Sequence, residues 1–182
     1  MKKFNLILMV LLTGILSCSP ANDNSESVEK SQSVEVNISE EENAINQTVK
    51  NVYASLSFEE GTAPNYEAFK AHFLPEATMY DYSGDSLAIF SIDDWTTDFK
   101  ALVDEEQITS LKVIEGGGET EYFGKIANRI SVNVDYFNES EEAEKGVNSI
   151  QLVKVNGKWL INSITWDVEK EGQPIPEKYD LK

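Results

Sequence analysis

Residues 146–169, with the sequence GVNSIQLVKVNGKWLINSITWDVE, contain two strand-like runs on either side of Asn156 and Gly157. This dipeptide is typical of a two-residue type I′ turn, because both central residues of that turn have a positive φ angle. The segment therefore predicts a β-hairpin in which Gln151 lies opposite Asn162. Apolar residues occur on both faces of the hairpin, so we expect it to lie inside a sheet that is partly covered on both sides.

Three helices are predicted before the hairpin, from apolar residues that recur at helical spacing. They are expected over residues 39–57, 66–73 and 91–105. Ser39 and Ser91 each precede an acidic residue by three positions, which is the pattern of a capping box, or a variant of it, at a helix N-terminus. Pro75 follows the second helix and is expected to end it.

The segments between the helices and the hairpin predict strands. Two short strands are expected on either side of a turn at residues 83–85, and two long ones between residues 108 and 136. Three consecutive glycines at positions 116–118 fall within the first long strand and indicate a bulge or a sharp bend. The sequence therefore predicts an α+β fold, with three N-terminal helices packed on one face of a strongly bent antiparallel sheet of about six strands.

The N-terminus has the features of a processing signal. Two lysines precede an apolar run over residues 4–16, and Cys18, the only cysteine, follows it. We expect residues 1–17 to be a lipoprotein signal peptide and Cys18 to carry the lipid; the alternative is an ordinary signal peptide with an incidental cysteine. Residues 18–38 predict a flexible polar tether, so the folded domain and its extended C-terminal tail are expected over residues 39–182. The expected location is the cell envelope of a bacterium, on the outer membrane facing the periplasm.

The chain is strongly acidic, with a formal net charge of −17 at pH 7. This charge excludes nucleic acid as a partner, because binding to phosphates requires an excess of Lys and Arg. It also opposes electrostatic binding to anionic lipids. We therefore expect the lipid anchor at Cys18 to be the only membrane contact.

Several motifs together resemble the nuclear-transport-factor-2-like superfamily, which includes the ketosteroid-isomerase-like and SnoaL-like proteins. They are FKAHFLPEATM at residues 69–79, SIDDW at 91–95, FGKIANRIS at 123–131 and the hairpin at 146–169. The resemblance implies a cone-shaped fold over about residues 39–169, with a ligand cavity between the concave face of the sheet and the helices, and homodimers formed through the outer sheet face. It does not imply one activity, because members include isomerases, dehydratases, hydrolases and domains with none.

Asp81 and His72 are the candidate catalytic residues. Asp81 lies between two tyrosines in the first predicted strand, where partial burial raises the pKa of a carboxyl group toward the range of a general base. His72 is the only histidine, so an imidazole acid or base can only be this residue. The alternatives are an aspartate that starts a turn, and a histidine that packs in the core or caps a helix.

Aromatic and amide side chains are the candidate lining of the ligand cavity. They are Tyr53, Tyr80, Trp95, Phe99, Gln151, Asn162 and Trp166. The two amides are expected in an apolar stripe, where they either bond one another or bind a ligand, and the tryptophans either stack on a flat ligand or pack in the core. No metal site and no cofactor are expected, since one histidine excludes a site of several and the acidic residues lack the spacing of a calcium loop.

These features predict an exported, membrane-anchored domain that binds a small apolar or amphipathic molecule, or a protein partner, without catalysis. The alternative is a cofactor-independent isomerase, dehydratase or hydrolase that acts on a small apolar substrate, with Asp81 or His72 as the base and a nearby tyrosine as the acid. A third interpretation is a homodimer or assembly subunit, in which the cavity is filled and the outer sheet face is apolar.

Overall fold

The computed structural model describes residues 32–179, with side chains from residue 40 onward. The helices are α1 (Gln32–Leu56), α2 (Tyr66–Lys70), α3 (Ile92–Glu105) and the short 3-10 helix η1 (Glu177–Tyr179). The strands are β1 (Phe73–Asp81), β2 (Ala88–Ser91), β3 (Leu111–Phe123), β4 (Ile126–Phe137), β5 (Glu144–Val155) and β6 (Lys158–Val168). The predicted signal peptide and Cys18 lie outside the described residues. Within residues 32–179, no helix is long and apolar enough to cross a membrane.

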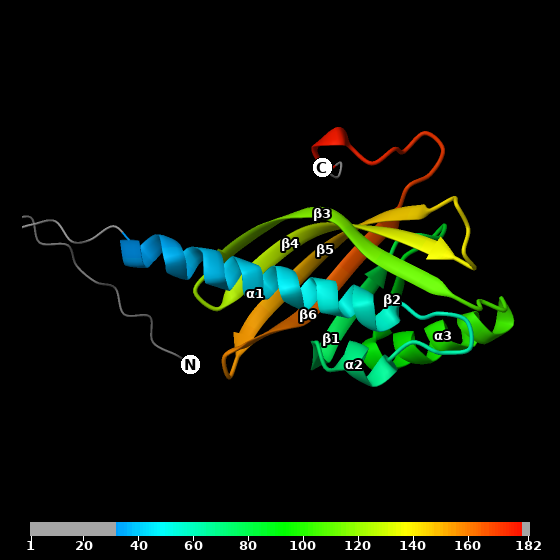
Figure 1. Ribbon diagram of the computed structural model, residues 1–182, viewed down its shortest axis with the longest axis horizontal. Coiled ribbons are helices and arrows are strands. Elements are labelled where there is room, and N and C mark those ends of the chain that lie inside the picture. Colours follow the sequence, from blue (N-terminus) through cyan, green and yellow to red (C-terminus); the bar gives the residue numbers. More distant parts are fainter. Residues whose placement is uncertain (1–31, 180–182) are drawn as a thin grey trace, which may run out of the picture.

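The six strands form one mixed sheet in the order β2-β1-β6-β5-β4-β3 (Figure 1). All neighbouring strands are antiparallel except β1 and β6, which are parallel. The α+β class and the six strands agree with the prediction, whereas the wholly antiparallel sheet is wrong at this one pair. Strand β6 is the last strand of the meander β3-β4-β5-β6, so its direction is set by its antiparallel pairing with β5. In that direction it runs parallel to its other neighbour, β1.

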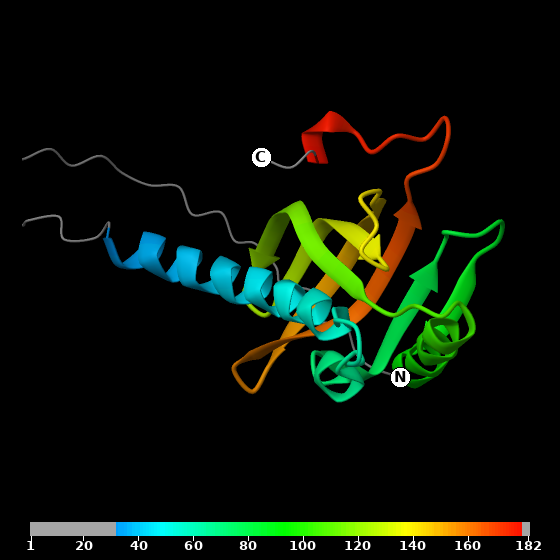
Figure 2. The same ribbon diagram turned by 45° about the vertical axis from the view of Figure 1, so that its right-hand side comes forward.

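Helix α1 lies across the concave side of the sheet (Figures 1 and 2). Ile45, Val49 and Val52 recur along one side of this helix and are buried in the core. The helix begins at Gln32, so the predicted N-cap at Ser39 lies inside it, and the helix includes the last residues assigned to the tether. Residues 32–38 contain neither glycine nor proline, so nothing in their sequence interrupts the helix.

Helices α2 and α3 pack against one another beside β1 and β2. The predicted cap of α3 is confirmed, because the Ser91 hydroxyl accepts a hydrogen bond from the Asp94 amide at 3.1 Å and donates one to the Asp94 carboxylate at 2.7 Å. Helix α2 is shorter than predicted and ends at Lys70. Strand β1 begins before Pro75, so pairing with β6 and not the proline ends the helical segment.

The hairpin of β5 and β6 has the predicted turn. Asn156 and Gly157 both have positive φ angles, of 49° and 82°. The register changes further along the strands, where Gln151 pairs with Ser163 and leaves Asn162 as an extra, bulged residue. The predicted pairing of Gln151 with Asn162 is therefore wrong.

The bulge decides which side chains of β6 are buried. Trp159 and Ile161 before it, and Ile164 and Trp166 after it, all pack in or against the hydrophobic core. Without the extra residue, strict alternation would turn the second pair to the opposite face of the sheet. The bulge thus keeps all four large apolar side chains on the concave face.

A second bulge lies in the three glycines of β3 and confirms the predicted irregularity. Glu115 pairs with Asn133 and Gly117 pairs with Val132, so Gly116 is the extra residue. Two residues later the backbones approach closely, since a Cβ atom on Gly118 would lie 2.4 Å from the carbonyl oxygen of Ile130. This position excludes any larger residue without a shift of the backbone.

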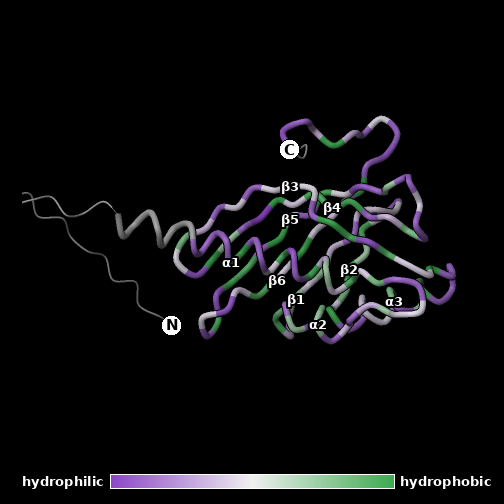
Figure 3. The backbone as a smooth tube through the Cα atoms, viewed as in Figure 1, coloured by the Kyte–Doolittle hydropathy of each residue, from purple (hydrophilic) through white to green (hydrophobic). Residues whose placement is uncertain are grey.

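After β6 the chain leaves the sheet as a C-terminal tail that ends at η1 (Figures 1 and 2). Lys170 holds the start of this tail, because its Nζ donates to the Asp167 carboxylate at 3.1 Å and to the backbone oxygen of Tyr82 at 3.2 Å. Gln173 donates to the other Asp167 oxygen at 3.0 Å. Figure 3 shows mostly hydrophilic residues in the tail, whereas hydrophobic residues gather in the strands of the sheet.

We expect Gly118→Ala to lower the free energy of unfolding by about 1–3 kcal/mol, because the new methyl group meets a backbone oxygen that cannot rotate away. Urea unfolding monitored by tryptophan fluorescence measures the change. Gly84→Ala is the matched control, since a Cβ there meets no atom within 4 Å, and its stability should stay the same or rise by up to about 1 kcal/mol. Equal stability of the two variants would contradict the close approach of the Gly118 backbone to the carbonyl oxygen of Ile130.

Candidate functional site

A cavity of about 240 Å³, here called the cone cavity, lies between the concave face of the sheet and the helices. This volume is just below the range of about 300–1,000 Å³ that is typical of sites for drug-sized molecules. Aromatic side chains form much of the lining: Phe69, Phe73, Trp95, Phe99, Phe137 and Trp166. The polar lining residues are Tyr53, Asp81, Asn133, Asp135 and Asn148. The cavity therefore suits a small and mostly apolar molecule.

Three of the aromatic rings form a continuous stack on α2 and α3. The Trp95 ring lies 4.9 Å from the Phe69 ring at 30° and 4.9 Å from the Phe99 ring at 7°, measured between centroids and between planes. Trp95 and Phe99 lie four residues apart in α3 and thus on one side of the helix. The rings fix one another in position and give this wall of the cavity a rigid, polarisable surface.

Asp135 on β4 is the most unusual polar group of the cavity. Its Oδ2 accepts a hydrogen bond from Asn133 Nδ2 at 2.8 Å, whereas its Oδ1 is buried and has no partner within the described part of the chain. Burial raises the pKa of the Asp135 carboxyl group to about 6, helped by the negative charge of Glu144, although the bond from Asn133 opposes the shift. One carboxyl oxygen is thus buried without a partner in the wall of an apolar cavity.

Asn133 is held in position by Asn148 on β5. Asn148 Nδ2 donates to Asn133 Oδ1 at 2.8 Å and to the Tyr53 hydroxyl at 3.0 Å, so both of its amide protons are used. Gly146, which pairs with Asn133, leaves the room for this contact, because a Cβ atom there would lie 2.8 Å from Asn133 Oδ1. The orientation of the Asn133 amide toward Asp135 is therefore fixed.

The chain of hydrogen bonds continues from Tyr53 to a buried ion pair. The Tyr53 and Ser131 hydroxyls lie 2.9 Å apart, and Ser131 Oγ donates to Glu115 Oε1 at 2.8 Å. Arg129 Nε donates to the same oxygen at 2.8 Å, and the side chains of Arg129 and Glu115 are only 6% and 4% exposed. Since Ser131 gives its proton to Glu115, Tyr53 gives its own to Ser131.

Tyr53 is consequently unable to act as a proton donor to a molecule in the cavity. Burial raises the pKa of its hydroxyl, so the group stays protonated, and that proton is committed to Ser131. The tyrosine acid of the catalytic alternative is therefore not supplied by Tyr53. The carboxyl groups are the remaining acid–base groups of the lining.

The structure brings five of the predicted site residues to the cone cavity: Tyr53, Asp81, Trp95, Phe99 and Trp166. Asp81 accepts a hydrogen bond from the Ser83 amide at 2.7 Å, as expected of an aspartate that starts a turn. Tyr80 directly precedes Asp81 in β1 and points to the other face of the sheet. His72 lies before β1, outside the lining, and burial lowers its pKa.

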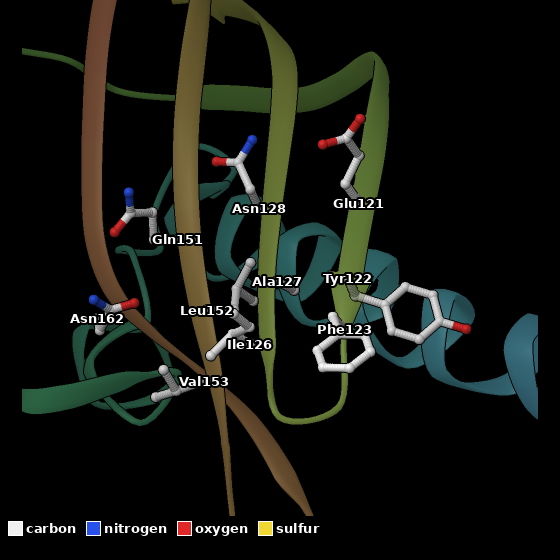
Figure 4. Close-up of a pocket in the computed structure, with 10 residues that line it drawn as sticks. All are labelled: Glu121, Tyr122, Phe123, Ile126, Ala127, Asn128, Gln151, Leu152, Val153 and Asn162. Atoms are coloured by element: carbon white, nitrogen blue, oxygen red, sulfur yellow. The ribbon is translucent and has the colours of Figure 1, made fainter. Parts of the chain in front are cut away.

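Gln151 and Asn162 lie on the opposite face of the sheet from the cone cavity. Both line a separate groove of about 570 Å³, here called the outer groove, between β3 and β6. Figure 4 shows them with Asn128 and Glu121, one from each of four neighbouring strands. Gln151 accepts a hydrogen bond from Ser163 at 3.3 Å, so the predicted mutual bond of the two amides is replaced by this one.

Three polar residues of the cone cavity, Asp135, Asn133 and Asn148, are absent from the predicted site residues. The signal that identifies the first two is the alternation in β4, where polar residues occupy positions 129, 131, 133 and 135 and Val132 and Val134 lie between them. Such a strand is normally placed with its valines inward. Here the polar side faces the cavity and α1, because Arg129 and Glu115 neutralise one another and each amide has a partner.

No protein-family model matches the chain, and no curated protein matches it in sequence. Solved structures do. A nuclear-transport-factor-2-like protein of unknown function from Pseudomonas putida has a TM-score of 0.60 at 12% identity, over 79% of this chain and 97% of the other. A second such protein, from Silicibacter pomeroyi, has a TM-score of 0.54 at 17% identity, over 72% and 98%. The fold is nuclear-transport-factor-2-like.

A third structure with this nuclear-transport-factor-2-like fold is an enzyme by name. It is the hexachlorocyclohexane dehydrochlorinase of Novosphingobium barchaimii, with a TM-score of 0.57 at 9% identity, over 75% of this chain and 91% of the other. At such identities the likeness concerns the fold, and the chemistry depends on the residues of each cavity.

We expect Asp135→Asn to change how stability depends on pH. The folded-state pKa of Asp135 is raised to about 6 from an ordinary value of 3.8. The protonated carboxyl group therefore contributes most to the free energy of unfolding below pH 4. This contribution to stability is lost as the pH rises through 6. The amide does not ionise, so the variant should gain up to about 2–3 kcal/mol relative to the wild type between pH 4 and pH 7.5.

Urea unfolding at both pH values measures this gain. Asp85→Asn, at an exposed position in the β1–β2 loop, is the matched control, and its effect should stay within about 0.5 kcal/mol at each pH. A gain as small for Asp135→Asn as for the control would show that the Asp135 carboxyl group is well solvated.

Proposed function

We propose that this protein binds a small, mostly apolar molecule in the cone cavity through a hydrogen bond to Asp135. The observation that carries the proposal is the buried Asp135 Oδ1 atom, which has no partner among residues 40–179 although its residue lines an aromatic cavity. A buried carboxyl oxygen without a partner is costly, and native structures rarely keep one without a reason. A donor group on a bound molecule supplies the missing partner.

The surroundings of Asp135 favour a fixed binding geometry. Asn133 occupies Oδ2, and Asn148 holds Asn133, so the free oxygen has a set direction before any molecule enters. Trp95, its stacked neighbours and Trp166 give the apolar part of the molecule an aromatic wall to pack against. Preorganisation of this kind lowers the entropic cost of binding.

Phenol is a suitable neutral probe, because it combines a flat ring with one hydroxyl donor. We expect phenol to shift the NMR signals of the Trp95 and Trp166 indoles in the full-length protein and not that of Trp159, whose N–H donates to Glu41 at 2.9 Å away from the cavity. Asp135→Asn should weaken binding about tenfold, since a hydrogen bond to a charged group is worth about 1.5–3 kcal/mol.

A matched pair of variants controls this experiment. Val168 lines the cone cavity at the end of β6, whereas Val155 is the exposed last residue of β5, next to the hairpin turn. Val168→Trp should abolish the phenol shifts by filling the cavity, and Val155→Trp should leave them unchanged. Shifts that persist in Val168→Trp, or that arise at the outer groove, would contradict the proposal.

Acid–base catalysis in the cone cavity is the second candidate function. The pKa of Asp135 of about 6 suits a general base near neutral pH. A protein of the same fold is a dehydrochlorinase by name, which makes an elimination on a small apolar substrate a reasonable comparison. The commitment of the Tyr53 proton to Ser131 weighs against a tyrosine acid, so Asp135, with Asp81 as the other carboxyl group of the lining, would carry the proton transfers.

Export and anchoring through a lipid on Cys18 are a separate proposal, supported by the apolar run before this cysteine. We expect the protein in its bacterial host to incorporate labelled palmitate and to sediment with membranes. Cys18→Ser should lose the label and the membrane association, and Ser19→Ala, the adjacent control, should keep both. Equal sedimentation of the two variants would contradict the anchor. The homodimer through the outer sheet face stays a prediction.

A further inference from the structure

The charges around the cone cavity are all of one sign. Two carboxyl groups, Asp81 and Asp135, belong to its lining, and within the described residues the lining contains no lysine, arginine or histidine. The whole chain carries a net charge of −17. A molecule with a carboxylate or phosphate group would therefore enter against the field of the protein and find no cation to pair with.

The aromatic side chains add a second feature that distinguishes between ligands. The faces of aromatic rings are electronegative and attract cations within about 6 Å of the ring centroid, with tryptophan the most effective. Trp95 and Trp166 both line the cone cavity, and because Phe69 and Phe99 cover the two faces of Trp95, Trp166 is the tryptophan that can turn a ring face to a cation. An aromatic wall beside a buried carboxyl group is a suitable environment for an organic cation.

A neutral and a cationic hydrogen-bond donor differ in whether they compensate the charge of the Asp135 carboxylate. A hydroxyl group satisfies the free Asp135 Oδ1 atom but leaves the carboxylate charge uncompensated in an apolar cavity. A protonated amine donates the same hydrogen bond and also neutralises the charge. Arg129, the nearest buried cation in the hydrogen-bonded chain, is already paired with Glu115 and serves a different carboxylate.

We propose that the molecule bound in the cone cavity is a small organic amine in its protonated form, with the ammonium group on Asp135 and a compact apolar body against Trp166 and the ring edges of the Trp95 stack. This inference rests on the function proposed above, and it names the chemical class of the ligand. The volume of about 240 Å³ restricts the body to about the size of one ring with a short side chain.

The affinity for a protonated amine should depend on pH through the ionisation of Asp135. Glu144 on β5 is paired with Asp135, Tyr53 on α1 feels its charge, and Asp81 is the other carboxyl group of the lining; none of these groups is cationic. A bound ammonium ion stabilises the ionised carboxylate and lowers the pKa of Asp135. Binding of the amine should therefore weaken as the pH falls below about 6.

Calorimetric titration of the full-length protein with benzylamine, benzyl alcohol and benzoate tests the proposal, because these probes share a ring and differ in the charge of the polar group. At pH 7.5 we expect benzylamine to bind at least tenfold more tightly than benzyl alcohol, and benzoate not to bind. At pH 5 the preference should shrink. In Asp135→Asn, benzylamine should lose its advantage while benzyl alcohol still binds, which also shows that the variant is folded.

The outcomes separate the two proposals. Binding of benzyl alcohol as tight as that of benzylamine overturns the amine inference and leaves a neutral ligand for the cone cavity. Tight binding of benzoate overturns it as well. Failure of all three probes, together with failure of phenol, overturns the proposed function itself. A preference for benzylamine that survives in Asp135→Asn places the cation at another acidic group and also contradicts the inference.

Discussion

The buried ion pair of Arg129 and Glu115 is the interaction on which the polar interior depends. Both side chains are almost fully removed from solvent, and a buried charge without a partner costs several kcal/mol. Arg129 also donates to Asn46 on α1 and to Thr120 on β3, so the pair joins the helix to two strands. Because Glu115 accepts from Ser131, it sets the direction of every hydrogen bond from there to the cone cavity.

This direction connects the core with the chemistry of the cavity. Tyr53 can only donate to Ser131, and Asn148 therefore donates to Tyr53 and to Asn133. The N–H group of the Asn133 amide therefore points toward Asp135. It donates a hydrogen bond to one carboxyl oxygen, and the other oxygen has no partner in the described part of the chain. A carboxyl group at the end of such a chain has a defined orientation and a raised pKa at the same time.

The sequence was sufficient for the hairpin turn, the cap at Ser91 and the bulge at Gly116, since each depends on local backbone chemistry. The sequence was insufficient where a strand's register or the side that it turns to the core depends on residues far apart in the chain. The bulge at Asn162 exists because four apolar side chains must share one face, and no dipeptide marks it. Asp135 was missed because the orientation of β4 depends on partners from other strands, such as Glu115 and Asn148, and nothing local to β4 indicates it.

The extra residue Gly116 also reverses the two sides of β3. Before it, Val113 and Glu115 face the interior; after it, Thr120 does so and hydrogen-bonds to Asn46 at 2.8 Å. Glu119 and Glu121, in contrast, are exposed. Without the bulge, strict alternation of the same sequence would present the carboxylates of Glu119 and Glu121 to α1 in place of Thr120. The bulge at Gly116 thus determines which side chains of the second half of β3 form the interior.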